Sequence, residues 1–452
     1  MALTKVTYSM ISGAVVNVKD YGATGNGTTD DTAAFNLAIA AGSNVYCPAG
    51  IYRLTTLTIP NKNGFTLEGA GGKLVTTGTR YSGNTVFKFD ADVAGADGLV
   101  VTDFVGLTLK NFVVSHRKTT GGGRAVFLSG GNDFTVDNIK IDSQSAGKGL
   151  VLGGGTGATA NFQGSIKNVK VLIDGGDAIR SDTTNTSLTF ESCYQIGGTF
   201  SFIGTTYSTL NSLASESAPF YGYAFNNCNG MTVNACGGEV NGRGLVYMST
   251  NTRNMVFNTP VGISNNTVNG SAWGELFEID SSVGACTNIT INNPSSINPA
   301  ALTLCGIRGT SGTGNVYING ADAANLPKGI GGDATWLLYD AVIMGDLQKV
   351  QFFPTLAAGW TLVGSPTISA YYYRVGKIVN FSITITPGTS LKANAGDRIN
   401  LPWFIDVGTG LNVVDGNAAG YVSATAAGTS IFMPVTPVLT VPLTISGQLL
   451  TV

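Results

Sequence analysis

The chain has 452 residues, a net charge of −2 and only 12% charged residues, whereas 62 of its residues are glycine. This near-neutral charge gives no sign of a nucleic-acid-binding surface. The sequence also contains neither a run of about 18 apolar residues nor a signal peptide, so we expect no membrane insertion. A chain of this length has room for one long repetitive domain and a second, smaller one.

The N-terminal part is expected to be a stub over residues 1–15, followed by a strand, a glycine-rich loop and a helix. The run VVNVKDYGATGNGTTDDTAAFNLAIAAG, residues 15–42, carries this pattern. Asp30 or Asp31 is positioned to cap the helix rather than to bind a metal. We expect the helix to cover the open apolar end of the domain that follows. Its apolar residues at helical spacing are Ala34, Leu37, Ala38 and Ala41.

One unit recurs nine times between about residues 106 and 325, at spacings of 20 to 34 residues. In each copy a polar residue follows an apolar one, and a further residue of the buried type usually comes two positions later. A repeat of ~20–30 residues with two or three short strands is the size of one coil of a parallel β-helix, whereas a propeller blade needs ~40–50. The polar positions are Lys110, Asp137, Lys167, Glu191, Asn211, Asn234, Asn258, Asn292 and Asn319.

The sequence changes character near residue 340. Runs such as SAYYYRVGKIVNFSITITP and TVPLTISGQLL alternate like strands and are separated by turn signals. Several short strands of this kind predict an antiparallel β-sandwich or jelly roll. We therefore predict an all-β protein with a parallel β-helix over residues 16–340 and a C-terminal β-sandwich over residues 341–452.

No metal or cofactor site is predicted. The six cysteines form no CxxC pair and no pair with histidine, and we expect all of them to be reduced, several of them in the core. The only histidine is His116, and the chain has no GxSxG motif that would suggest a serine nucleophile beside it.

Two glutamates occupy the same place in consecutive copies of the repeat. Glu216 and Glu239 each lie five residues after the polar position, so their backbones should be ~5 Å apart on adjacent coils. Cleavage of a glycosidic bond needs one carboxylic acid and one carboxylate, and two close carboxyl groups favour this division because they repel each other when both are ionised. The simpler interpretation is a solvated pair of surface glutamates.

Aromatic and charged residues surround this pair in the sequence. Tyr207 and Tyr221 are candidates for stacking against sugar rings, whereas Tyr223 is interpreted as part of the core. Arg243, four residues after Glu239, could bind an acidic sugar or neutralise Glu239. A second candidate cluster lies in the longest insertion of the repeat, expected to be a loop over residues 265–280, where it could complete the binding face or provide an alternative catalytic pair. It consists of Trp273, Glu275, Glu278 and Asp280.

The run DYGATGNGTTDDTAAFNLAI, followed by VYCPAGIYRL, resembles the opening motif of pectate-lyase-like right-handed β-helix proteins. It is particularly similar to bacteriophage tailspikes and capsule depolymerases. TYSMISGAVVNVKDYGA resembles the junction between a virion-attachment head and the β-helix, and ASESAPFYGYAFNNCNGMTVNACGGEV resembles another tailspike segment. The resemblance covers roughly residues 8–320 and implies a right-handed coil, although such folds carry lyases, hydrolases and esterases alike.

The resemblance also implies a homotrimer on the phage tail, together with other tail proteins. The main functional hypothesis is a tailspike that hydrolyses a bacterial surface polysaccharide, either capsule or O-antigen, with Glu216 and Glu239 as acid and base. A polysaccharide lyase acting on a uronate is the first alternative. An adhesin that binds glycan without cutting it is the second. The C-terminal domain could hold the trimer together or bind glycan.

Overall fold

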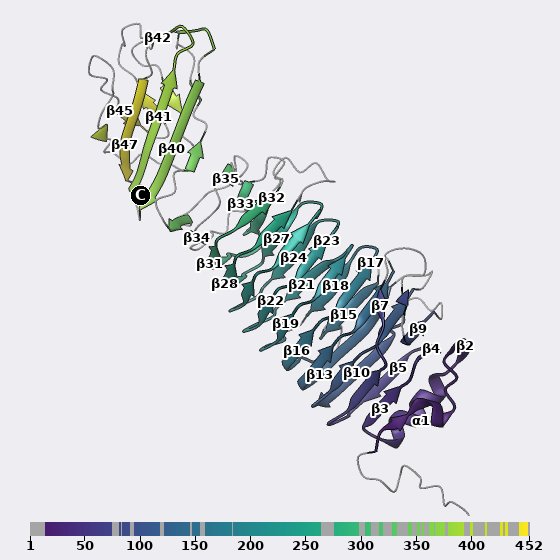
Figure 1. The fold of residues 1–452 in the computed structure, drawn as a ribbon. Helices are drawn as coiled ribbons and strands as arrows, with labels where there is room; N and C mark the ends of the chain where they lie inside the picture. Colours follow the sequence, from purple (N-terminus) through teal and green to yellow (C-terminus); the bar gives the residue numbers. More distant parts are fainter. Residues whose placement is uncertain are drawn as a thin grey trace, which may run out of the picture.

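The computed structural model describes residues 14–74, 81–82, 84–90, 95–117, 122–144, 147–153, 159–182, 184–263 and 275–297, and shorter segments, mostly strands, between 303 and 450. Most of these residues wind into stacked coils, each of which contributes strands to three parallel ladders (Figure 1). The expected parallel β-helix is therefore confirmed. Within the described residues, no helix is both long and apolar enough to cross a bilayer.

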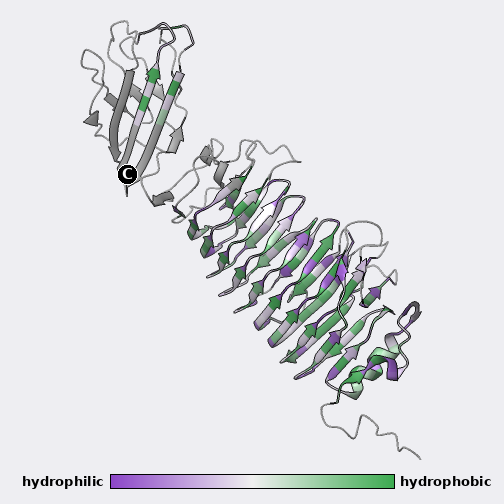
Figure 2. Ribbon diagram, viewed as in Figure 1, coloured by the Kyte–Doolittle hydropathy of each residue, from purple (hydrophilic) through white to green (hydrophobic). Residues whose placement is uncertain are grey.

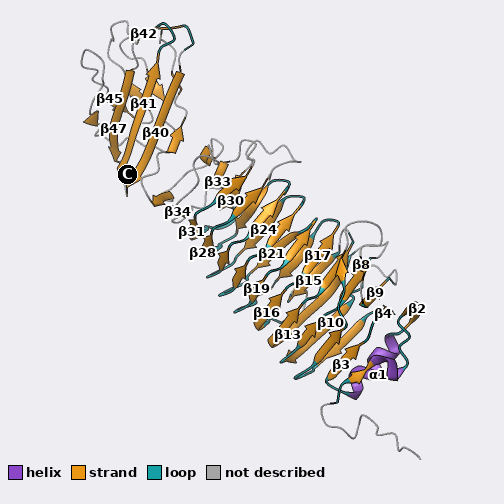
Figure 3. Cartoon of the chain, in the orientation of Figure 1, coloured by secondary structure: helices purple, strands orange, loops and turns teal. Residues whose placement is uncertain are grey.

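The three ladders run along the length of the solenoid (Figure 3). The first contains β5 (Leu57–Pro60), β10 (Leu99–Val105), the start of β13 (Arg124–Asp137), β15 (Lys148–Leu152), β18 (Asp177–Ser181), β21 (Thr199–Ile203), β24 (Tyr221–Asn226), β27 (Gly244–Ser249), β30 (Glu275–Asp280), β33 (Thr303–Arg308) and β35 (Lys328–Gly331). The second contains β1 (Val16–Asn17), β3 (Asn44–Cys47), β6 (Thr66–Gly69), β11 (Thr108–Lys110), the end of β13, β16 (Phe162–Lys167), β19 (Thr189–Glu191), β22 (Thr209–Asn211), β25 (Thr232–Asn234), β28 (Arg253–Asn258), β31 (Thr287–Asn292), β34 (Val316–Asn319) and β36 (Val342–Gly345). The third contains β2 (Asn26–Asp30), β4 (Gly50–Leu54), β9 (Thr85–Phe89), β12 (Val113–His116), β14 (Lys140–Ser143), β17 (Lys170–Ile173), β20 (Tyr194–Ile196), β23 (Ala214–Glu216), β26 (Gly237–Glu239), β29 (Val261–Ile263) and β32 (Ser295–Ile297).

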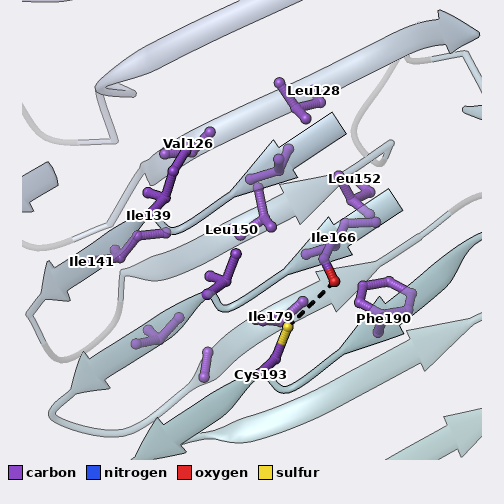
Figure 4. Close-up of a cluster of buried hydrophobic side chains, with 14 of the residues drawn as sticks. Val126, Leu128, Ile139, Ile141, Leu150, Leu152, Ile166, Ile179, Phe190 and Cys193 are labelled. Atoms are coloured by element: carbon purple, nitrogen blue, oxygen red, sulfur yellow. Dashed lines mark hydrogen bonds between the residues drawn. The ribbon is translucent and has the colours of Figure 1, made fainter. Parts of the chain in front are cut away.

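Apolar side chains fill the inside of the coils as continuous stacks. Because neighbouring coils are in register, the apolar residue that precedes each polar position lies directly above the equivalent residue of the next coil. Figure 4 shows such stacks around Ile166 and Phe190, and Figure 2 shows the hydrophobic residues recurring along the coils. The predicted inward positions are all buried: Leu109, Val136, Ile166, Phe190, Leu210, Val233, Phe257, Ile291 and Ile318.

The polar positions form a ladder on the outside of the second ladder of strands. At the four polar positions from Asn234 to Asn319, each asparagine amide donates a hydrogen bond of 2.8 Å to the side-chain oxygen of the asparagine one coil earlier. In earlier coils, opposite charges meet instead, as in the Lys110–Glu68 pair at 3.1 Å and the Lys167–Glu191 pair at 3.3 Å. The polar positions thus connect neighbouring coils through hydrogen bonds and ion pairs, in addition to marking the repeat in the sequence.

Replacing Asn258 by aspartate tests this ladder, because the two side chains have the same shape but a carboxylate cannot donate a hydrogen bond. In the unmodified chain, Asn258 Nδ2 donates to Asn234 Oδ1 at 2.8 Å. In the variant, a carboxylate oxygen of the new aspartate would take the place of Nδ2 and face the Asn234 oxygen. We expect the free energy of unfolding to fall by about 1–3 kcal/mol at neutral pH. Since only the protonated carboxyl can donate, folding raises the pKa of the new group, and the deficit should shrink as the pH falls through that pKa. Urea-unfolding midpoints of Asn258→Asp and the unmodified chain, measured between neutral pH and about pH 4, check this. An equal deficit at every pH would contradict it.

Helix α1 (Thr32–Ala41) covers the N-terminal end of the coils, as expected (Figure 3). Its buried face is different from the predicted one, because Phe35 packs edge-on against the rings of both Tyr52 and Phe87 and thereby sets the rotation of the helix. Leu37 is 58% exposed, and Ala41 is exposed as well. The residues that face the core are Ala34, Phe35, Ala38 and Ile39.

The two aspartates before the helix have separate structural roles. Asp30 accepts a hydrogen bond from the backbone nitrogen of Thr32 at 2.9 Å, and so caps the first turn of α1. Asp31 occupies the N-cap position, but its carboxylate binds the preceding loop instead, through Thr24 at 2.7 Å and Gly25 at 3.1 Å. Turn and cap chemistry therefore accounts for both.

The chain switches from parallel to antiparallel pairing after β36 (Figure 1). One sheet contains β37 (Val350–Phe352), β40 (Thr367–Val375), β41 (Ile378–Thr386), β47 (Leu443–Leu450) and β44 (Asn412–Val413). A second contains β38 (Thr355–Leu356), β43 (Arg398–Asn400), β46 (Ser430–Phe432) and β45 (Thr425–Ala427), and β39 (Thr361–Val363) pairs with β42 (Ser390–Lys392). The C-terminal part is thus antiparallel, as a β-sandwich requires.

Candidate functional site

Glu216 and Glu239 lie side by side on the outside of the third ladder. Strands β23 and β26 pair in parallel with Glu216 directly opposite Glu239, so the two backbones are ~4.8 Å apart. Glu216 is half-buried and Glu239 is exposed, whereas the residue before each one faces inward. The register predicted from the repeat therefore holds, and both side chains start from the outer wall.

Backbone hydrogen bonds fix both glutamates at the ends of their strands. The Glu216 carbonyl accepts from Gly197 at 2.8 Å, and the Glu239 carbonyl accepts from Ser217 at 2.9 Å. The residues that follow the glutamates, Ser217 and Val240, both have the left-handed backbone conformation, with φ of 55° and 54°. The same conformation recurs where strands end in other coils, for example at Ser192, Ser212 and Thr259, so it belongs to the turns of the solenoid.

A tyrosine that was not singled out from the sequence contacts one of the two carboxylates. Tyr194 lies on β20, one coil before Glu216, and its hydroxyl donates a hydrogen bond to Glu216 Oε2. The ammonium group of Lys170, one further coil back, lies 4.8 Å from the centre of the Tyr194 ring. The next positions of the same outward column are the small residues Ala214 and Gly237. The surface beside the two glutamates therefore carries only small side chains and has an aromatic residue at one end.

Buried polar groups lie directly behind the glutamates, where other coils have apolar stacks. Gln195 and Ser215 face inward and are hydrogen-bonded to each other, and Ser215 donates to Asn241 Oδ1 at 3.1 Å. Asn241 Oδ1 also accepts from the backbone nitrogen of Ala218 at 3.0 Å. Because Ala218 belongs to the turn after Glu216, this network connects the core to the turn between the third and first ladders.

Arg243 lies in the corresponding turn of the next coil. Its guanidinium is 5.0 Å from the centre of the Phe220 ring, and its Nε is buried without a hydrogen-bond partner among the described residues. Within the same part of the chain, Arg243 forms no ion pair with Glu239. The described structure thus shows no contact through which Arg243 would neutralise Glu239, and its binding of an acidic sugar stays a prediction.

The predicted aromatic platforms occupy different places. Tyr207 is 68% exposed but lies in the turn between β21 and β22, at another corner of the coil from Glu216. Tyr221 begins β24, is only 7% exposed and stacks on Tyr247 with ring centres 5.3 Å apart, which leaves little of its ring open to a sugar. Tyr223 is buried as expected, and its hydroxyl donates to the backbone carbonyls of Leu213 and Gly237, both at 2.8 Å.

The second candidate cluster lies on the first ladder rather than beside the glutamate pair. Glu278 is 2% exposed and pairs in register with Tyr247, whose hydroxyl donates to Asp280 Oδ2 at 3.0 Å. Glu275 begins β30, but its side chain and all of Trp273 lie outside the described residues. The structure thus brings Glu278 and Asp280 close to the stacked tyrosines, and it does not bring them to Glu216 and Glu239.

The remaining titratable candidates are structural. His116 is 2% exposed, and its Nε2 lies 3.1 Å from the Ala96 carbonyl oxygen. Burial raises the pKa of the Cys193, Cys228 and Cys236 thiols to about 12, so they carry no thiolate at neutral pH. No set of three or more potential metal ligands gathers within the part of the chain that the structure describes. The five cysteines described are free and buried: Cys47, Cys193, Cys228, Cys236 and Cys286.

Known proteins share both the sequence pattern and the fold. A family profile described as rhamnogalacturonase A/epimerase, pectate lyase-like, matches residues 15–233. A mannuronan C5-epimerase of Azotobacter vinelandii, AlgE2, is 38% identical over 152 residues, which cover 28% of this chain and 14% of the epimerase. The pre-neck appendage protein of Bacillus phage B103 is 32% identical over 123 residues, which cover 27% of this chain and 11% of that protein. The chain therefore spans only a small part of the length of these relatives.

Among solved structures, the enzymatically active domain of tailspike protein 2 from bacteriophage CBA120 aligns with a TM-score of 0.55 at 13% sequence identity. The alignment covers 97% of this chain and 76% of the tailspike domain. The fold is thus that of the pectate-lyase-like right-handed β-helix proteins. Within this class, the expected resemblance to bacteriophage tailspikes is confirmed by the tailspike structure and by the phage appendage protein.

Proposed function

We propose that this chain is a tailspike of a phage virion that binds a bacterial surface polysaccharide, capsule or O-antigen, and hydrolyses its glycosidic bonds. The observation that carries the proposal is the register of β23 and β26, which sets Glu216 beside Glu239 on an outer wall. Similarity to phage tail proteins and to enzymes named for polysaccharide chemistry supports the same class of substrate. Like other tailspikes, it would act at the host surface as a homotrimer, with other tail proteins as partners.

The two carboxyl groups would have different tasks. The Tyr194 hydroxyl donates a hydrogen bond to Glu216 Oε2, which would orient this carboxyl group for the role of base or nucleophile. Glu239, exposed and one coil further on, would protonate the leaving oxygen. A carboxyl separation of ~5 Å gives a covalent intermediate and retention, whereas ~6.5–9.5 Å leaves room for a water molecule and gives inversion.

A polysaccharide lyase is the second candidate, and one contact favours it. Lys170 and Tyr194 lie in a row that leads to Glu216, and lysine and tyrosine are the groups that can neutralise a uronate carboxylate and abstract the neighbouring proton. Elimination would break the bond between the sugar carbon and the glycosidic oxygen without adding water. The product would then contain a carbon–carbon double bond.

Incubation with purified capsule or O-antigen, followed by mass spectrometry of the oligosaccharides, separates these reactions. We expect products with new reducing ends and the mass of one added water for each bond cleaved. Unsaturated products that lack this water and absorb ultraviolet light would contradict hydrolysis and show that the reaction is an elimination. Tight binding with unchanged polymer length would overturn both proposals and indicate an adhesin.

A further inference from the structure

Two lysines of like charge are stacked in register on the third ladder, close to the candidate site. Strands β14 and β17 pair with Lys140 directly opposite Lys170, at the strand separation of ~4.8 Å. Like charges in directly opposite positions destabilise a sheet. Elsewhere on the solenoid the chain avoids this cost, because Lys110 and Lys167 each meet a glutamate of a neighbouring coil.

Neither lysine of this stacked pair forms an ion pair within the described residues. Lys140 Nζ donates only to a backbone carbonyl, that of Asn168, at 2.8 Å. Burial is the largest cause that lowers the pKa of the Lys140 ammonium group, and the charge of Lys170 also lowers it, whereas Cys193 and Asp137 act in the opposite direction. A bound anion would offset both costs.

The acidic groups on neighbouring elements have partners of their own. Arg117 forms ion pairs with the buried Asp142 at 2.9 Å and with Asp174 at 3.1 Å, so each of these two carboxylates already has a cationic partner. Asp137, on the second ladder, accepts a hydrogen bond from Asn168 at 3.0 Å. Asp137 attracts the Lys140 ammonium group electrostatically, but among the described residues neither ammonium group forms an ion pair with a carboxylate.

The lysine pair is continuous with the glutamate pair. Lys140, Lys170, Tyr194 and Ala214 are successive residues of a single outward column, and Glu216 is two residues beyond Ala214 on the same strand. Counting strands, Lys170 lies ~10 Å and Lys140 ~14 Å along the solenoid from the strand of Glu216. A polysaccharide that lies along this face would therefore reach both lysines within a short run of sugars from the bond held at Glu216 and Glu239.

We propose that Lys140 and Lys170 form an anion-binding subsite, and that the natural glycan carries an acidic group a few sugars away from the bond that is cleaved. This inference rests on the proposed function for the position of the glycan. The recognised chemistry is an anionic oxygen group, such as a uronate carboxylate or a sulfate or phosphate ester. Charge-assisted hydrogen bonds from the two ammonium groups would hold it.

The binding test uses polymers of defined charge. Dissociation constants are measured by biolayer interferometry at low salt for dextran sulfate, uncharged dextran, polygalacturonate and methyl-esterified pectin. We expect at least one anionic polymer to bind at least about tenfold more tightly than its uncharged counterpart. Because the whole chain has a net charge of −2, such a preference must come from a local patch. Preference for dextran sulfate alone would assign a sulfate or phosphate ester, and preference for polygalacturonate alone would assign a carboxylate.

The variant Lys140→Gln/Lys170→Gln should lose this preference. The matched control, Lys110→Gln/Lys167→Gln, removes two lysines from another ladder, where each is paired with a glutamate, and should keep the preference. Absence of any preference in the unmodified chain, or an equal loss in both double variants, would overturn the inference. Binding is measured without cleavage, so failure of the proposed hydrolysis in the product assay would be seen separately.

Discussion

Glu239→Gln is expected to lower the rate of polysaccharide cleavage by about 10²–10⁴-fold, which is the usual contribution of a general acid or base. Glutamine keeps the shape of the side chain but cannot give up a proton to the leaving oxygen. Since Glu239 is exposed and its backbone is held by the ladder, we expect the folded structure to be unchanged. Reducing-end release from host polysaccharide, at saturating substrate, measures the effect.

Glu216→Gln should lower the rate by a similar factor, because in the proposed mechanism both carboxyl groups would act on one bond. The double variant should be little slower than either single one, since residues that act as a unit are not additive. Glu191→Gln is the matched control, because Glu191 is an exposed glutamate on the second ladder, paired with Lys167 at 3.3 Å. If Glu239→Gln cleaves as fast as the unmodified chain, or if Glu191→Gln is equally impaired, the proposed site is wrong.

Asn241→Leu is expected to lower the free energy of unfolding by about 2–5 kcal/mol. Asn241 is completely buried, and its Oδ1 accepts hydrogen bonds from Ser215 and from the backbone nitrogen of Ala218. Leucine fills a similar volume but accepts no hydrogen bond, and each buried donor left without a partner costs about 1–3 kcal/mol. The midpoint of urea unfolding measures the loss.

A double-mutant cycle with Ser215→Ala shows whether the loss comes from this network. Removal of the Ser215 hydroxyl leaves one donor fewer to be satisfied, so the two substitutions should be less than additive. The turn held by Asn241 joins Glu216 to β24, so cleavage activity should fall together with stability. A change in stability below about 0.5 kcal/mol would show that the network contributes no more than an average surface contact.

The coil architecture could be predicted from the sequence because it imposes the same requirement on every repeat. On the second ladder, the inward residue is apolar in every coil, and the polar residue after it contacts the equivalent residues of the coils above and below. The same pair of residue types therefore recurs along the sequence. The adjacent positions of Glu216 and Glu239 follow from the same count of residues. The face of α1 could not be predicted this way, because the fit of Phe35 against Tyr52 and Phe87 decides it.

The environment of the glutamates was less accessible to sequence reasoning. Tyr194 and Glu216 lie on neighbouring strands, but Glu216 is two residues beyond the position opposite Tyr194. The repeat predicts the register of the backbones but not the direction of the side chains. The inward polar residues Gln195 and Ser215 were the available signal, because they interrupt a position that is apolar in the preceding coils. Lys140 and Lys170 could also have been found by aligning the third strand of each coil rather than the second.

The hydrogen bonds of the asparagine ladder have the same length although the coils that they join differ in their number of residues. The hydrogen bond between Asn292 and Asn258 spans 34 residues of sequence, the one between Asn258 and Asn234 spans 24, and both are 2.8 Å long. The additional length is therefore absorbed at a corner and leaves the stacking of coils unaltered. A corner segment can thus differ in length from coil to coil while the stacked scaffold keeps the same contacts.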